Sequence, residues 1–448
     1  MRARLIRLAG ELRESYWFVP TIMAVAALLL AAAMVWLDSH HATAWMDRLP
    51  WLYAARPEGA RSLLSSIGGS MIGVAGTTFS VTIAAVVYAS GQYGPRLLSN
   101  FMSDRGNQVT LGTFIATFLY SLVVVRTIRS PGEQAGEAAF VPQLAVLVGV
   151  LLVLCSIAVL IYFIHHVPSR IHINSVIERI GDRLLADFSR RYPIGIGEPL
   201  DPADDEARIP AALRLNEGAD HHQRRDFIEA TETGYIQLVD EEKLIESARQ
   251  NAVVLRLRHR PGDFVHLGST LFDISPAGAM TDETIMAIRD TVAIGSRRTA
   301  LQDMRFFIDE LVEIAARALS PGVNDPFTAN SCLDWLGAAM ADLARRSLPS
   351  SFRADEDGTL RVIACPVTFE GFVYRSFGAL AQYASADMIA ARHYLTTISD
   401  VMRNCQDAGR RATLTRMVED FRELAEESLK GFNCRDLTQQ VNRLLLRR

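Results

Sequence analysis

Four long stretches of the chain lack Asp, Glu, Lys and Arg, and all four end before residue 170. They cover residues 15–37, 62–95, 106–125 and 138–169. An α-helix rises about 1.5 Å per residue, so about 20 uncharged residues are enough to cross the hydrocarbon core of a bilayer. The pattern therefore predicts four membrane-spanning helices within a transmembrane domain of residues 1–169.

The arginines that flank these stretches predict how the helices are oriented. Eleven arginines lie on one side of the membrane, at positions 2, 4, 7, 13, 96, 105, 170, 179, 183, 190 and 191. Five lie on the other side, at positions 48, 56, 61, 126 and 129. The side richer in Arg faces the cytoplasm. We expect a multi-pass protein of the bacterial inner membrane with both termini in the cytoplasm.

After the fourth stretch the pattern changes to that of an amphipathic helix and then to that of a linker. Residues 171–192 place apolar side chains at helical spacing, whereas residues 193–232 are rich in Pro, Gly and acids. We interpret residues 170–232 as a helix followed by a linker.

Residues 233–276 have the pattern of a small β module. We predict strands over 234–239, 252–260 and 264–274, with a short helix between the first two. A tight turn at Arg260-Pro261-Gly262-Asp263 precedes the third strand. The run PGDFVHLGSTL is similar to the turn of lipoyl-type β domains, but the Met-Lys-Met that carries their prosthetic group is absent from it. We expect a lipoyl-like module without a cofactor.

The rest of the chain, residues 277–448, is predicted to be mostly helical. A long amphipathic helix is expected over 297–319, and the run SPGVNDP should end it. Asp325 is placed to cap the next helix, and TLRVIACPVTF at 359–369 favours one or two strands. The fold class is therefore four N-terminal transmembrane α-helices followed by a cytoplasmic α+β region, composed of a small β module and a helical bundle.

Composition and motifs narrow the function. Only two of the 448 residues are Lys, the net charge is −4, and no basic tract suggests nucleic acid. The five cysteines lack the CxxC spacing of a zinc or redox site, so no metal is expected. The chain has no Walker loop, GxSxG elbow, HExxH or dinucleotide fingerprint, and we expect no enzyme activity and no cofactor.

The second hydrophobic stretch is unusually small and polar for a membrane helix. One set of residues is spaced to form a single stripe: Gly69, Gly73, Gly76, Ser80 and Ala84. A second set carries hydroxyls or an amide on more than one face: Ser66, Ser70, Thr77, Thr78, Thr82, Ser90 and Gln92. The stripe is typical of close helix packing, and the hydroxyls suit a wall in contact with ions or solute. The sequence leaves both interpretations open.

Isolated polar residues offer weaker candidates. Arg297, Arg298 and Asp303 on the predicted helix, with Asn324 and Asp325 in the turn after it, are candidates for ligand binding or gating. Ion pairing, turn formation and capping explain the same residues without a ligand. His165-His166 suits pH sensing or metal binding, and equally suits interfacial anchoring or capping of a helix C-terminus.

The segments described so far resemble a family of predicted bacterial membrane proteins called domain of unknown function 2254. The resemblance rests on SSIGGSMIGVAGTTFSVTIAAVVYASGQYGPRLLSNFMSDRGNQVTLGTF, on TGYIQLVDEEKL with RPGDFV, and on ALSPGVNDPFTANSCLDWL. It implies the same architecture and supplies no activity.

Together these patterns favour an oligomeric channel or transport-related protein whose cytoplasmic part gates or assembles it. Four helices seldom enclose a pore alone, so we expect a homo-oligomer whose other partners are the lipid bilayer and small ions. The alternative is a membrane-anchored sensor or scaffold that binds a ligand or protein partner through its cytoplasmic domain.

Overall fold

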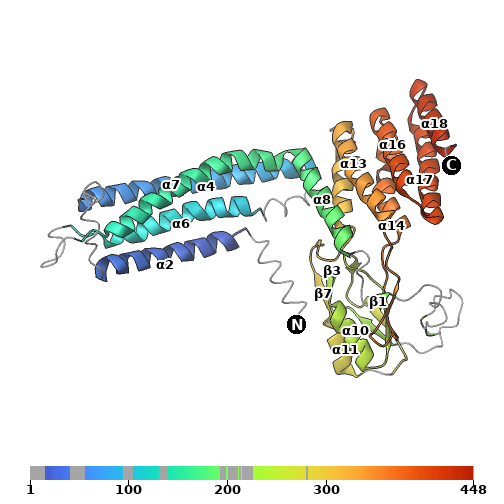
Figure 1. Ribbon diagram of the computed structural model, residues 1–448, viewed down its shortest axis with the longest axis horizontal. Coiled ribbons are helices and arrows are strands. Elements are labelled where there is room, and N and C mark those ends of the chain that lie inside the picture. Colours follow the sequence, from blue (N-terminus) through green and yellow to red (C-terminus); the bar gives the residue numbers. More distant parts are fainter. Residues whose placement is uncertain are drawn as a thin grey trace. The chain divides into compact units, whose positions relative to one another are not determined.

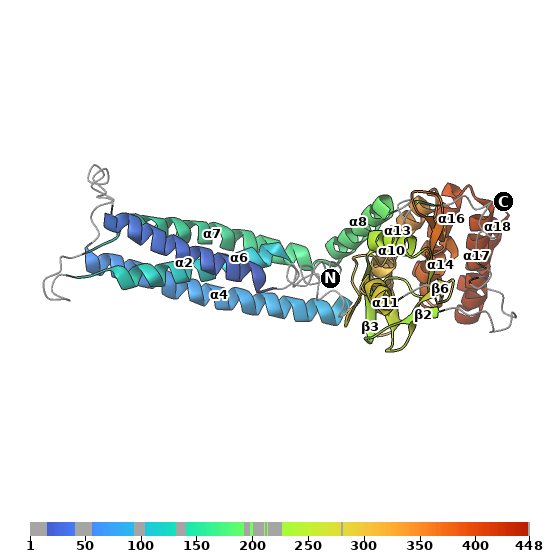
Figure 2. The ribbon, with the colours of Figure 1, turned by 90° about the horizontal axis from the view of Figure 1, so that it is seen from below.

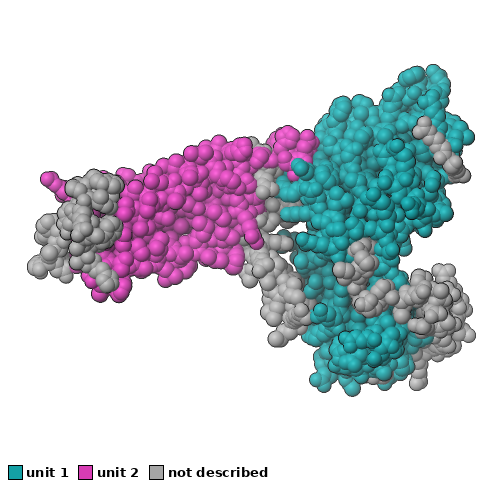
Figure 3. All heavy atoms as spheres, viewed as in Figure 1, with its two compact units in different colours: residues 1–10, 176–448 teal, residues 11–175 magenta. Residues whose placement is uncertain are grey.

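The computed structural model describes residues 16–40, 56–93, 104–130, 140–191, 198–199, 210, 213, 226–278 and 281–446. The chain forms two compact units (Figure 3). We call residues 11–175 the membrane unit and residues 176–448 the C-terminal unit.

The membrane unit contains four helices that are long and apolar enough to cross a bilayer, as the sequence predicts (Figure 1). They are α2 (Phe18–His40), α4 (Pro57–Tyr93), α6 (Arg105–Thr127) and α7 (Gln143–Ile171). Helix α6 is central, because it packs against each of the other three. Half of the apolar window of α6 is buried, against 28% or less in the other helices.

Large side chains fill the interior of the membrane unit. Tyr120 and Phe114 of α6 and Leu64 of α4 are fully buried, and the Tyr120 hydroxyl donates to the Ala145 carbonyl at 2.8 Å. A Cβ on Gly112 would lie 2.6 Å from the Met23 sulfur, so α6 and α2 approach closely there. The described part of this unit is therefore a packed bundle.

The C-terminal unit begins within α8 (Ile173–Arg191), which follows α7 after one residue. The apolar face of α8, which includes Ile180, Leu184 and Phe188, is buried. Gly181 lies on the same face, and a Cβ there would stand 2.2 Å from the Trp335 ring. Phe188 also packs edge-on against Phe372, with ring centroids 5.5 Å apart. These contacts dock α8 on the helices of its own unit.

Two antiparallel-rich sheets follow, and Figure 2 shows strands of both. The strands are β1 (Glu198–Pro199), β2 (Asp226–Glu229), β3 (Gly234–Val239), β4 (Val254–Leu257), β5 (Phe264–Val265), β6 (Thr270–Ser275), β7 (Val292–Gly295), β8 (Phe352–Ala354) and β9 (Leu360–Ile363). One sheet has the order β1-β8-β9-β4-β6-β2 and the other β5-β3-β7. Along the chain, helix α10 (Glu241–Gln250) lies between β3 and β4, and helix α11 (Asp282–Arg289) lies between β6 and β7.

Both sheets extend beyond the range 233–276 predicted for the β module. Strand β7 completes the smaller sheet, and β9 pairs in parallel with β4 in the larger one. Antiparallel partners can follow a tight turn, whereas a parallel partner needs a long crossover connection. Buried Leu255, Phe272 and Val362 from three neighbouring strands belong to one core.

The remaining helices form the part of the C-terminal unit shown from orange to red in Figure 1. They are α12 (Phe306–Ala318), α13 (Pro326–Leu343), α14 (Phe369–Val373), the π-helix η4 (Tyr374–Gly378), α15 (Ala379–Ala384), α16 (Met388–Asn404), α17 (Ala408–Ser428) and α18 (Phe432–Leu445). Buried Tyr394 of α16 stacks on Phe421 of α17 with centroids 4.1 Å apart. As predicted, Asp325 caps α13, accepting a hydrogen bond from the Thr328 amide at 3.1 Å.

The helix predicted over 297–319 begins only at Phe306. Residues 297–305 are not helical. Arg298, Asp303 and Arg305 lie in this preceding segment, where they take part in ion pairs with one another. Apolar periodicity alone could not reveal these ion pairs.

Candidate functional site

The small-residue stripe of α4 lies on the outside of the membrane unit. A Cβ on Gly69, Gly73 or Gly76 would meet no atom of the described residues within 4 Å. Thr77 and Ser80 are exposed beside these glycines. The glycine of α4 that does pack in the unit is Gly68, where a Cβ would lie 3.6 Å from the Ser121 Cβ.

The exposed hydroxyls of α4 bond to their own helix. Ser70 donates to the Ser66 carbonyl at 2.7 Å, and Ser80 donates to the Gly76 carbonyl at 2.9 Å. Thr77 likewise donates to the Gly73 carbonyl at 3.1 Å. Each hydroxyl proton is therefore satisfied without water, and each oxygen keeps capacity to accept from, or to coordinate, another group.

The remaining polar candidates of α4 have different positions. Thr78 and Thr82 are only 3% and 2% exposed, on the face that packs in the bundle. The set of hydroxyls predicted from the sequence therefore divides into an outer group and an inner pair. Ser90 and Gln92 belong to α4, and their side chains lie outside what the structure describes.

A polar cluster in which His166 and Asp104 are buried joins α6 and α7. His166 Nε2 lies 2.9 Å from Asp104 Oδ1, and His166 Nδ1 lies 2.8 Å from the Tyr162 hydroxyl. Asp104 also caps α6 by accepting from the Asn107 amide at 3.2 Å. His165 is exposed, so the two adjacent histidines differ in burial, and His166 is the one within the cluster. No group of three His, Cys, Asp or Glu side chains suited to a metal occurs among the described residues.

The C-terminal unit contains a network of arginines and aspartates around Arg298. Asp303 accepts from Arg298 Nε at 2.9 Å and pairs with Arg305 Nε at 3.1 Å. Asp309 lies 2.5 Å from Arg298 Nη1 and 2.5 Å from Nε of Arg375, which lies in the π-helix. The network therefore connects the segment before α12, α12 itself and η4.

Arginine contacts favour the charged form of the Asp309 and Asp263 carboxyls. Burial by itself raises the pKa of Asp309, but hydrogen bonds from Arg375 and Arg298 outweigh it and leave the pKa below its usual value. Burial acts in the same direction on Asp263, and hydrogen bonds from the Arg260 amide and the Arg305 side chain lower the pKa of that carboxyl.

The turn predicted at 260–263 packs against this network. Gly262 has φ +90°, and a Cβ on it would lie 2.0 Å from Asp303 Oδ2. Asp263 lies 2.8 Å from Arg305 Nη2. Both the backbone conformation and the close carboxylate therefore require glycine at position 262.

The other residues proposed from the sequence stay apart from the network. Arg297 is exposed, and its carbonyl accepts from Gln237 Nε2 at 2.7 Å. Asn324 has φ +49° in the turn before α13, and Asp325 caps that helix. For Asn324 and Asp325 the structure shows the turn and capping roles that the sequence had offered as one explanation.

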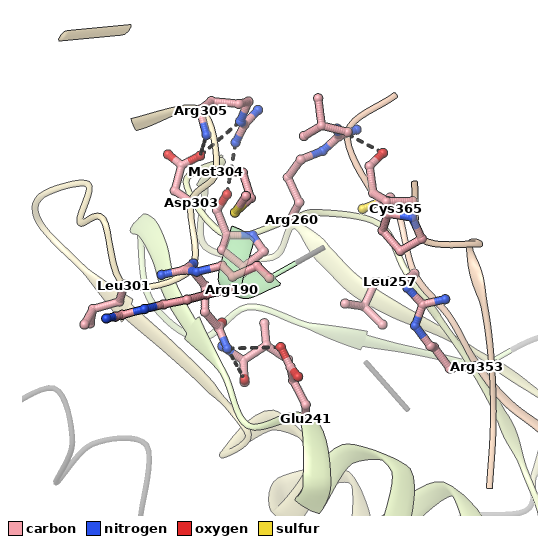
Figure 4. Close-up of a pocket in the computed structure, with 18 residues that line it drawn as sticks. Arg190, Glu241, Leu257, Arg260, Leu301, Asp303, Met304, Arg305, Arg353 and Cys365 are labelled. Atoms are coloured by element: carbon pink, nitrogen blue, oxygen red, sulfur yellow. Dashed lines mark hydrogen bonds and ion pairs between the residues drawn. The ribbon is translucent and has the colours of Figure 1, made fainter. Parts of the chain in front are cut away.

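A cavity of about 370 Å³ lies between α8, the sheets and the segment before α12 (Figure 4). Five arginines and two carboxylates line it: Arg190, Arg191, Arg260, Arg305, Arg353, Glu241 and Asp303. Of these seven residues, the sequence offered only Asp303 as a candidate for ligand binding or gating. Apart from the neighbours Arg190 and Arg191, the other charged residues belong to segments that are well separated along the chain.

Comparison with known proteins places the chain among proteins without an assigned activity. The family model described as predicted membrane protein (DUF2254) matches residues 13–400. Uncharacterised proteins of Mycobacterium tuberculosis and Mycobacterium bovis are 31% identical to the chain over 427 residues. The alignment covers 93% of this chain and 78% of each relative. No solved structure matches.

Proposed function

The chain belongs to the DUF2254 family of predicted membrane proteins, and on that premise we propose that it is an oligomeric channel or transport-related protein. In this proposal copies of the chain associate through α4 in the bacterial inner membrane. The C-terminal unit lies in the cytoplasm and gates or assembles the membrane helices.

The observation that carries the proposal is the outward direction of the small face of α4. Gly69, Gly73 and Gly76 have open space beside them, while large side chains fill the inside of the same unit. Small faces of membrane helices allow two backbones to approach closely, which stabilises association by van der Waals contact. A second copy of α4 supplies a neighbour at positions where a Cβ meets no atom of the described residues within 4 Å.

The exposed hydroxyls of α4 are the polar groups that would contact ions or solute in this proposal. Thr77 and Ser80 lie on the exposed side of α4, and their oxygens can still coordinate a cation or accept from a solute. In an assembly around α4 these oxygens line the contact between copies. A path for ions or solute then forms between copies, because the interior of each copy is filled.

The first test replaces the small residues. Gly73→Leu or Gly76→Leu should dissociate the assembly while leaving the single copy folded, because a Cβ at either position meets none of the described residues within 4 Å. Val81→Leu is the control, since Val81 is also exposed on α4 but outside the stripe. Light scattering of the detergent-solubilised protein measures the assembly, and intact oligomers in both glycine variants contradict the proposal.

The second test separates conduction from assembly. Thr77→Val and Ser80→Ala remove an exposed hydroxyl and nearly keep the shape, so assembly should persist while ion flux into liposomes changes. Thr82→Val is the matched control, because its hydroxyl is buried inside the unit. Absence of flux through assembled wild-type protein excludes the channel.

One observation favours the alternative of a membrane-anchored sensor. The arginine-lined cavity of the C-terminal unit has the size of a small-molecule site. A sensor predicts ligand binding and no flux under any condition, whereas a gated channel predicts flux that a ligand changes.

A further inference from the structure

The cavity of the C-terminal unit combines charged and apolar walls. Its arginines come from the end of α8, the turn before β5, the segment before α12 and strand β8 (Figure 4). Leu257, Met304 and Pro366 are among its apolar lining. A pocket of this size, with apolar walls and a few convergent polar groups, is typical of sites for small organic ligands.

The carboxylates in the cavity do not balance its arginines. Asp303 pairs with Arg298 and Arg305, so that carboxylate is already shared. Glu241 lies near both Arg353 and Arg191, so one carboxylate is shared between two arginines there. Positive charge therefore exceeds negative charge on the cavity wall.

Arg353 is the most informative residue of the cavity. It is 2% exposed and donates Nη1 to the carbonyls of Ser350 and Phe352. Its Nε has no hydrogen-bond acceptor among the described residues. Burial also lowers the pKa of Arg353, with only Glu241 opposing the shift. A buried guanidinium with an unused donor is costly unless an anion completes it.

Arg191 provides a second unused donor from another element. Its Nη2 donates to the Ala300 carbonyl at 3.2 Å and lies 3.7 Å from Asp187. Its Nη1 is buried and lacks an acceptor within the described part of the chain. Arg191 of α8 and Arg353 of β8 thus both line the cavity, and each has one buried donor without an acceptor among the described residues.

We propose that this cavity binds a phosphate-bearing small molecule of nucleotide size. Arginine suits phosphate because its planar donors match the phosphate oxygens, and a multiply charged phosphate can engage more than one guanidinium. The apolar wall formed by residues such as Leu257 and Met304 takes the uncharged part of the ligand. The binding step is independent of whether the membrane helices conduct.

The cavity includes the end of the helix that follows the last membrane helix along the chain. Arg190 and Arg191 occupy the last turn of α8, and α8 follows α7 in the chain after one residue. A ligand that bridges Arg191 and Arg353 ties the end of α8 to strand β8.

The experiment uses the full chain in detergent, with ATP, AMP, inorganic pyrophosphate and adenosine as probes. Isothermal titration calorimetry should show binding of ATP or AMP, weaker binding of pyrophosphate and none of adenosine, because phosphate supplies the contact with the arginines. Pyrophosphate binding as tight as that of both nucleotides assigns the site to a free anion and contradicts the nucleotide-sized ligand.

Variants test which arginines make the contact. Arg353→Met and Arg191→Gln should each weaken binding by about ten- to a hundredfold, the range for a lost charged hydrogen bond. Arg403→Gln is the control and should bind as wild type does, because Arg403 is largely exposed and outside the cavity. If Arg353→Met fails to fold, Arg191→Gln decides the matter. No binding of either nucleotide, equal binding of adenosine, or unchanged binding in folded variants overturns the proposal.

Discussion

The Nε2 of His166 lies 2.9 Å from Oδ1 of Asp104 and joins the last part of α7 to the cap of α6, 62 positions earlier in the sequence. Tyr162 contacts the other ring nitrogen of His166 at 2.8 Å. The ring is thus held on both sides, and its position is fixed by two partners on different helices.

Removing either partner of this contact should destabilise the membrane unit. His166→Ala and Asp104→Asn should each lower the free energy of unfolding by about 1–3 kcal/mol, because a buried polar group loses its partner. The double variant should lose less than the sum of the two. Thermal unfolding in detergent measures this, with exposed His165→Ala as control. Equal losses in His165→Ala and His166→Ala contradict the assignment.

Substitutions at Gly262 and Gly268 distinguish backbone strain from steric clash as the cost of a new Cβ. Both have positive φ, +90° and +83°, but only Gly262 faces a close neighbour, the Asp303 carboxylate. Gly268→Ala should lower stability by about 1–2 kcal/mol through backbone strain alone. Gly262→Ala, and more so Gly262→Val, should lose more, because Asp303 must also move. Thermal unfolding of the full chain compares them, and equal losses show that Asp303 yields freely.

Gly181→Ala should destabilise the protein, although alanine has the higher helix propensity. Alanine in place of a mid-helix glycine usually stabilises by about 0.5–1 kcal/mol. Here the new Cβ would stand 2.2 Å from the Trp335 ring, so Gly181→Ala should instead destabilise by about 1–3 kcal/mol through overpacking. The fluorescence of Trp335 should shift to the red as α8 loosens. Asp182→Ala, at an exposed position of α8, should leave that emission unchanged.

The arginine–aspartate network predicts sensitivity to acid. The pKa of Asp309 in the folded protein lies below the usual 3.8, because Arg375 and Arg298 outweigh the effect of burial. Its charge therefore stabilises the fold above pH 3.8, and this contribution is lost as the pH falls through 3.8 towards the folded-state value.

Asp309→Asn is the variant for this prediction. It should be less stable than wild type at pH 7 and should lose less additional stability on acidification to about pH 3. Asp400→Asn removes a carboxylate that is more than half exposed and should keep the pH profile of wild type. Melting temperatures across the pH range decide between these outcomes, and parallel profiles for Asp309→Asn and wild type count against the network.

Membrane orientation has a direct test. A reporter enzyme that is active only in the periplasm should be silent when fused after Arg191 and active when fused near Ala54, because we expect the arginine-rich flanks of the helices to face the cytoplasm. The reverse pattern overturns the proposed orientation.

Periodicity in the sequence predicts much of the fold. The six-residue strand β3, Gly234–Val239, has the predicted bounds, since Gly234 marks its start and Asp240, which caps helix α10, follows its end. The four long membrane helices and the cap at Asp325 also follow the sequence. These features depend on residues close together in the chain, where spacing and capping chemistry act directly.

Contacts between residues far apart in the sequence could not be predicted from local periodicity. The glycine stripe of α4 suggests close packing, yet inside the unit it is Gly68, beside Leu64 and Met71, that faces the neighbouring helices. Which face of α4 packs depends on the shape of α6, which the sequence of α4 cannot reveal. Likewise Arg191 and Arg353 contribute to one cavity from positions far apart along the chain.

The parallel pairing of β4 with β9 determines when the larger sheet can close during synthesis. Strand β4 ends at Leu257, and its partner is complete only at Ile363. Until the ribosome has produced that later segment, one edge of β4 has unpaired amides and carbonyls, a situation that favours aggregation. Truncated chains that stop before residue 360 therefore retain an open sheet edge, and an expression fragment of this region has to include β9.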